Sequence, residues 1–198
     1  MDQAEQEDSS ARTARQLAQQ FKAQGNEAFK QERNEDAINL YTQAIELDPD
    51  THVYYSNRSA AYLKVGGSKS KALKDAECCV KLRPDWPKGY SRLGAAQYAL
   101  GRFDQALATY RRGLEIDPQS SALQAALRTT EQTKIKADER DAQVTKARAE
   151  ANDRRQAEAR RNAEKQAMAN MAAAAVLGDA CEGEGEEGEP PAAAAAGA

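Results

Sequence analysis

Five polar residues recur at intervals that would bring them together if the chain folded as a stack of helix pairs. The interval from Asn26 to Asn57 is 31 residues, and the interval from Asn57 to Lys88 is the same. Lys22 and Asn26 lie four residues apart, as do Lys88 and Arg92, so each pair occupies one face of a helix. Three cations and two amides on one surface form a receptor for carboxylates, because hydrogen bonds to a charged group contribute roughly 1.5–3 kcal/mol each.

An internal repeat supplies the elements that would position these residues. Asp48-Pro49, Arg83-Pro84 and Asp117-Pro118 recur at spacings of 35 and 34 residues, and each dipeptide follows an apolar run. Small residues recur in the same register, as expected where two helices cross closely, and proline ends one helix before the next begins. The pattern resembles the tetratricopeptide repeat (TPR), and it predicts three repeats, at 18–51, 52–86 and 87–120.

The segments around the repeats differ in composition. Residues 1–17 are predicted to form an acidic segment leading into the first helix, and 121–134 a helix that caps the last repeat. Residues 135–167 have high helix propensity but few bulky apolar residues, which predicts a charged, exposed helix without a coiled-coil seam. The acidic and alanine-rich residues 168–198 are predicted to be a disordered tail. The expected fold is all-α, a three-repeat TPR superhelix with these additions.

Three strings in the sequence carry a closer resemblance. They are Lys22-Ala-Gln-Gly25-Asn26, Tyr55-Ser56-Asn57-Arg58-Ser59-Ala60-Ala61-Tyr62 and Lys88-Gly89-Tyr90-Ser91-Arg92. They resemble the dicarboxylate-clamp TPR domains of co-chaperones, most of all the N-terminal TPR domain of the heat-shock organising proteins. The resemblance implies that the carboxylates of a chaperone's C-terminal Glu-Glu-Val-Asp bind at Lys22, Asn26, Asn57, Lys88 and Arg92. It also implies that groove contacts beside this clamp come from Phe29, Ala60 and Lys64.

The expected function is therefore that of a non-catalytic co-chaperone or adaptor. The resemblance implies a preference for the tail of the 70-kDa heat-shock chaperone over that of the 90-kDa one. Because the two tails share their last four residues, the groove contacts would have to select between them. Two alternatives remain open: a TPR adaptor for another acidic C-terminal peptide, and a scaffold that acts through the charged helix at 135–167.

Other classes of function find little support in the composition. The chain has one histidine, His52, and no glycine-rich phosphate loop, so no catalytic residue, metal site or cofactor is predicted. The three cysteines have no disulfide spacing and fit a reducing compartment. Charged residues make up 30% of the chain, and no basic run with interleaved aromatics occurs. We therefore expect a cytoplasmic monomer that binds neither membrane nor nucleic acid.

Overall fold

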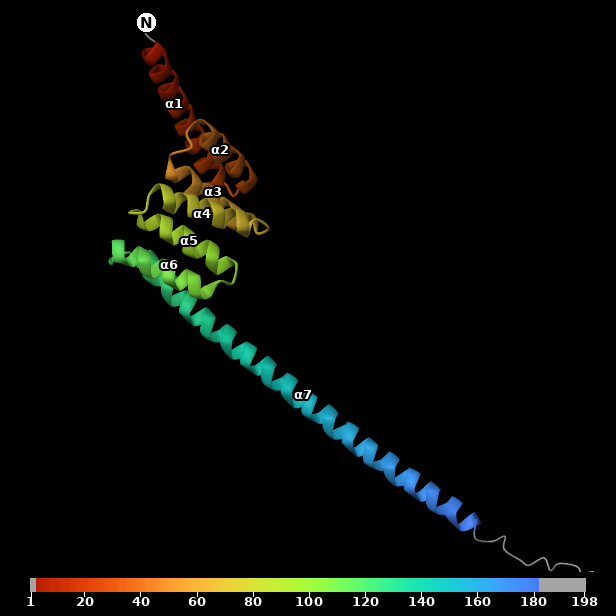
Figure 1. The fold of residues 1–198 in the computed structure, drawn as a ribbon. Helices are drawn as coiled ribbons and strands as arrows, with labels where there is room; N and C mark the ends of the chain where they lie inside the picture. Colours follow the sequence, from red (N-terminus) through yellow and green to blue (C-terminus); the bar gives the residue numbers. More distant parts are fainter. Residues whose placement is uncertain (1–2, 182–198) are drawn as a thin grey trace, which may run out of the picture. The chain divides into compact units, whose positions relative to one another are not determined.

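The computed structural model describes residues 3–181, with side chains placed over 10–173, and this part of the chain is helical without a strand (Figure 1). The helices of the described residues are α1 (Gln3–Lys30), α2 (Asn34–Leu47), α3 (His52–Val65), α4 (Lys69–Leu82), α5 (Pro87–Ala99), α6 (Phe103–Ile116) and α7 (Ser121–Cys181). None of them is apolar over a length that could cross a membrane.

The first six helices form three antiparallel pairs that follow one another in chain order. α1 packs on α2, α3 on α4 and α5 on α6, and each pair also contacts the next (Figure 1). Contacts between α1 and α3 and between α3 and α5 show that the first helices of the pairs lie along one side of the stack. The chain divides into two units, 1–138 and 139–198, and the first unit contains the three pairs.

The recurring X-Pro dipeptides end the second helix of each pair in the same way. Asp48, Arg83 and Asp117 have φ values of −146°, −142° and −132°, with ψ values of 79°, 81° and 86°. These angles lie outside the α region, which a following proline disfavours. Each of the three donates its backbone N–H to the carbonyl four residues earlier, at 3.0 Å. The repeat seen in the sequence thus marks one backbone conformation that occurs three times.

A glycine faces a tyrosine where the helices of the first and third pairs cross. A Cβ added to Gly25 would lie 2.7 Å from Cε1 of Tyr41, and one added to Gly94 would lie 2.3 Å from Cε1 of Tyr110. Only glycine allows so close an approach. In the second pair Ser59 stands in the place of the glycine, and its buried hydroxyl donates to a carbonyl of α4 at 2.8 Å.

The beginning of α7 covers the last pair. Leu123 is buried in a cluster with Ala106 and Tyr110 of α6, and Ala126 and Leu127 pack against the same cluster. This is the apolar face that the repeats would otherwise expose to water at their end, as expected for a terminal cap.

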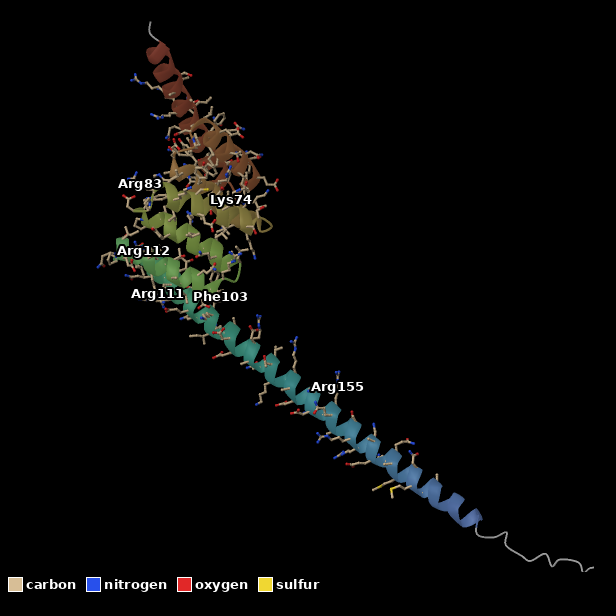
Figure 2. All side chains as sticks on the ribbon, in the orientation of Figure 1. Lys74, Arg83, Phe103, Arg111, Arg112 and Arg155 are labelled. Carbon is tan, nitrogen blue, oxygen red and sulfur yellow. The ribbon has the colours of Figure 1, made fainter. Side chains whose placement is uncertain are left out.

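The later part of α7 is a different kind of helix. Every side chain from 139 to 173 is exposed, including Arg155 (Figure 2). The prediction of a disordered tail from residue 168 differs from the structure, because α7 continues as far as Cys181. The reason is the alanine content of 167–175, since alanine has the highest helix propensity of all residues. The rest of the predicted tail, 182–198, lies outside the described residues.

Candidate carboxylate-binding site

A hollow of about 230 Å³ opens among α1, α2, α3 and α5. Five of the residues that the sequence placed in the clamp or in the groove line it, namely Asn26, Asn57 and Arg92 with Phe29 and Ala60. Lys30 and Tyr41 complete its wall. Three helix pairs therefore contribute to one small site, and it combines two amides and a guanidinium with an aromatic and a methyl group.

The two asparagines are held by a hydrogen-bond network. The Tyr41 hydroxyl donates to Oδ1 of Asn26 at 2.8 Å, and Nδ2 of Asn57 donates to the same oxygen at 3.0 Å. Because that oxygen accepts two bonds from the protein, the Nδ2 group of Asn26 is left to donate to a ligand. An amide that offers only its donors suits a carboxylate, which accepts but cannot donate.

The guanidinium of Arg92 is the partly buried cation of this hollow, whereas Lys30 is exposed and its Nζ lies 3.7 Å from a carboxylate oxygen of Glu27. Among the described residues Arg92 makes no ion pair, and its Nε is buried without a hydrogen-bond partner. Burial lowers the pKa of Arg92 from its ordinary value, while Cys79 and Tyr41 act in the opposite direction. Arginine nevertheless stays charged at neutral pH. A partly buried cation with no protein counter-ion is ready to pair with an anion from outside.

Arg58, the neighbour of Asn57 in sequence, is placed quite differently. Its Nε and Nη2 donate to the two carboxylate oxygens of Asp75 at 2.7 and 2.8 Å, and Nη1 donates to Thr42 at 2.9 Å. The side chains of this ion pair are 15% and 7% exposed. Arg58 thus ties α3 to α2 and α4 through three of its five N–H donors.

Lys88 lines a second hollow, of about 480 Å³, which Arg92 also lines. Its Nζ lies 5.9 Å from the centroid of the Trp86 ring, and the side chain of Lys88 is exposed. Leu123 at the beginning of α7 lines the same hollow. Arg92 thus lines both hollows.

Two sequence-predicted residues lie outside both hollows. Lys22, on α1 and one turn before Asn26, is half-buried and donates its Nζ to the side chain of Gln19. Lys64 is exposed in the last turn of α3. No group of acidic, histidine or cysteine side chains within the described residues could hold a metal ion.

Tyr41 and Trp86 were not among the residues that the sequence placed in the site, yet each lines a hollow. Tyr41 does pack, since it is 1% exposed, but its hydroxyl reaches Asn26. Trp86 packs edge-on against His52, with 4.6 Å between the ring centroids. The signal for Tyr41 was its place opposite Gly25, which brings its ring to the helix that carries Asn26.

Comparison with known families identifies the helix pairs. A model described as "TPR repeat" matches residues 25–66, and one described as "Tetratricopeptide repeat" matches residues 87–120. The chain contains tetratricopeptide repeats. The TPR region therefore includes Asn26 and Asn57 within the first match, and Lys88 and Arg92 within the second.

Relatives of the TPR region include a wheat (Triticum aestivum) protein named Hsp70-Hsp90 organizing protein, 50% identical over 111 residues. The match covers 56% of this chain and 19% of the wheat protein, so the chain spans about a fifth of that relative. The Saccharomyces cerevisiae heat shock protein STI1 is 44% identical over 118 residues, which are 59% of this chain and 20% of the yeast protein.

A solved structure with a similar fold is the first TPR of Spaghetti (RPAP3) bound to the HSP90 peptide SRMEEVD. It has a TM-score of 0.57 and 34% sequence identity, and the match covers 60% of this chain and 94% of that one. The peptide in that complex ends in the four residues Glu-Glu-Val-Asp.

Proposed function

We propose that this chain is a non-catalytic co-chaperone or adaptor, a cytoplasmic monomer that binds the acidic C-terminal peptide of a heat-shock chaperone. The observation that carries the proposal is Arg92, a partly buried cation without a protein counter-ion in the described residues. It lies beside two amides, one of which is held with its donor group free. A carboxylate at this point would satisfy both groups.

The similar proteins support a ligand of this type. The relatives include an organizing protein for Hsp70 and Hsp90, and the RPAP3 domain is bound to a peptide that ends in two glutamates, a valine and an aspartate. The hollow offers matching chemistry for such an end. Asn26, Asn57 and Arg92 would bind carboxylate oxygens, while Phe29 and Ala60 would contact the residues of the peptide that precede its last four.

The two lysines of the predicted clamp would act from the edge of the site. Lys88 lines the hollow that adjoins Arg92, and its exposed ammonium group can turn toward a carboxylate held there. Lys22 lies one turn before Asn26 on α1, and its present partner is an uncharged glutamine side chain. We propose that Lys22 exchanges this partner for the ligand, because a charge-assisted hydrogen bond is roughly twice as strong as a neutral one.

Calorimetric titration with a peptide ending in Glu-Glu-Val-Asp tests the proposed function. We expect a dissociation constant in the micromolar range, about −8 kcal/mol, and much weaker binding of the same peptide with an amidated C-terminus. Amidation removes one of the charges that the site would neutralise. Equal binding of the acid and the amide would contradict the assignment.

The variant Arg92→Ala should weaken binding about tenfold to a hundredfold, since it removes a charge-assisted contact. Arg111→Ala is a matched control, because Arg111 is an exposed arginine of α6 that lines neither hollow (Figure 2). Its ion pair with Glu131, a 3.4 Å contact, is also exposed. If both variants lost affinity equally, the effect would be one of overall charge and not of the site.

Partner choice between the two chaperones is the finer part of the proposal. We propose that the 70-kDa chaperone's tail is preferred, and that Phe29, Ala60 and Lys64 select it through residues upstream of the shared last four. Phe29 and Ala60 line the hollow, and Lys64 follows Ala60 by one helical turn. A competition titration with both tails measures the preference, and stronger binding of the 90-kDa chaperone's tail would reverse it.

A second candidate function is a scaffold that acts through α7. The observation in its favour is the exposure of every side chain from 139 to 173. If this helix associated with a second copy, the molar mass of the chain would rise with concentration. A constant mass in sedimentation or light scattering would leave peptide binding as the function.

A further inference from the structure

We propose that Tyr41 is a positioning residue for ligand binding, because its hydroxyl fixes the side-chain amide of Asn26 with the NH₂ group facing the hollow. The inference rests on the proposed function of that hollow as a carboxylate site. Tyr41 is a core residue, and the inference gives it a second role beside packing. That role depends on the contact between its hydroxyl on α2 and Asn26 on α1.

The geometry around Oδ1 of Asn26 carries the first step. This oxygen accepts from the Tyr41 hydroxyl at 2.8 Å and from Nδ2 of Asn57 at 3.0 Å. A carbonyl oxygen has two lone pairs, so both are used. If the amide turned over, its NH₂ group would face two donors, and its oxygen would face the incoming carboxylate. Both changes are unfavourable.

The placement of Tyr41 itself is fixed by packing. Its side chain is 1% exposed, in a cluster with Ala28, Ala37 and Ala61. The ring lies against Gly25, where a Cβ would come within 2.7 Å, so α1 and α2 approach closely enough for the hydroxyl to reach α1. The hydroxyl therefore cannot move away from Asn26 without disturbing the crossing of the two helices.

The hydroxyl of Tyr41 also keeps its proton. Burial raises the pKa of Tyr41 to about 12, although the charge of Arg92 acts to lower it. At neutral pH the hydroxyl is therefore a donor, and a donor is what the oxygen of Asn26 requires. Asn57 alone would leave the amide with one protein contact in place of two.

Tyr41→Phe removes this donor and retains the ring that packs on Gly25. We expect the full-length variant to bind the Glu-Glu-Val-Asp peptide about three- to tenfold more weakly, the size expected for one neutral hydrogen bond. Tyr110→Phe is the matched control, because Tyr110 packs on Gly94 in the same way but lines neither hollow. That control should bind like the wild type.

A double-mutant cycle separates positioning from a structural role. In an Asn26→Ala background Tyr41→Phe should have no further effect on affinity, because the amide that it orients is absent. If Tyr41→Phe binds like the wild type, or weakens binding equally in both backgrounds, the inference is overturned. If the wild type itself fails to bind the peptide, the proposed function fails first.

A measurement on the wild type covers the case in which Tyr41→Phe does not fold. The side-chain NH₂ resonances of Asn26 should shift when the peptide is added to the ¹⁵N-labelled chain, since Nδ2 is the group that faces the ligand. The absence of such a shift at saturating peptide would also overturn the inference.

Discussion

Arg58 and Arg92 lie on the first helices of successive pairs, and the protein uses them in opposite ways. Arg58 makes three hydrogen bonds, two of them to the carboxylate of Asp75, and its ion pair is largely buried. Arg92 is also partly buried, yet its Nε has no partner, and no carboxylate of the described residues pairs with it. One guanidinium holds three helices together, and the other faces a hollow.

The difference shows that burial of a charge does not by itself reveal its purpose. A buried ion pair stabilises a fold only if its geometry is good, and removing one partner leaves a charge that is costly to bury. A partly buried cation without a partner makes the free protein less stable than it could be, and this cost is recovered when an anion binds. Substitution of each arginine should therefore affect stability and binding in opposite proportions.

The largest effect is expected for Arg58→Met, which leaves the carboxylate of Asp75 buried without its counter-ion. The free energy of unfolding should fall by about 3–5 kcal/mol. Urea unfolding measures it, and Arg83→Met is the control, since the ion pair of Arg83 with Asp85 is exposed and should contribute about 1 kcal/mol or less. A similar small effect for both variants would mean that Asp75 is solvated without Arg58.

Stabilisation by the ligand should be nearly as large. Peptide at a hundred times its dissociation constant should raise the free energy of unfolding of the wild type by about 2.7 kcal/mol. The same concentration should stabilise Arg92→Met by only about 0.4–1.4 kcal/mol, because its affinity is expected to be tenfold to a hundredfold lower. Thermal melts with and without peptide check this. Equal shifts for both proteins would remove Arg92 from the site.

Substitutions at the two glycine–tyrosine crossings should have effects of intermediate size, and they distinguish a loss of stability from a loss of peptide binding. Gly25→Ala and Gly94→Ala should each destabilise the fold by about 1–3 kcal/mol, since the new methyl group would collide with a tyrosine ring. Only Gly25→Ala should also weaken peptide binding at a temperature where both variants are folded, because Tyr41 contacts Asn26. Calorimetry beside circular dichroism tests this, and an equal loss of binding would point to a general loosening of the stack.

The smallest effect is expected for the stability of Arg92→Met without ligand, which is to be compared with that of Arg58→Met. In the absence of ligand Arg92→Met should leave the free energy of unfolding unchanged or raise it slightly, by about 0.5 kcal/mol, because it removes a partly buried charge with which no described residue pairs. The methionine keeps most of the apolar stem and removes a charge that has no protein partner in the described residues. A loss comparable to that of Arg58→Met would show that Arg92 has a structural role.

Much of the fold can be predicted from local sequence signals. The X-Pro dipeptides set the ends of α2, α4 and α6, because proline restricts the residue before it whatever the surroundings. The segment 168–181 was harder to predict, because its low-complexity composition is typical of disorder while its alanine content favours a helix. In the structure this segment is part of α7.

The candidate site could be predicted in part. The helical period and the 31-residue interval brought Asn26 and Asn57 together, and their amides are hydrogen-bonded. The same reasoning placed Lys22 in the clamp beside Arg92, and the family resemblance placed Lys64 in the groove, although neither lysine lines either of the two hollows. A period fixes the face of a helix on which a side chain lies, but the reach of a long lysine depends on its neighbours.

The sequence by itself determined the repeat, the turns and the side of the stack on which the polar residues gather, since these follow from spacing and backbone chemistry. Tertiary structure alone decided that Arg58 is paired while Arg92 is not, and that Tyr41 orients Asn26. Each of these depends on whether a particular atom of another helix lies within about 3 Å. The spacing of residues along the chain does not give that distance, because it depends on how the helices pack.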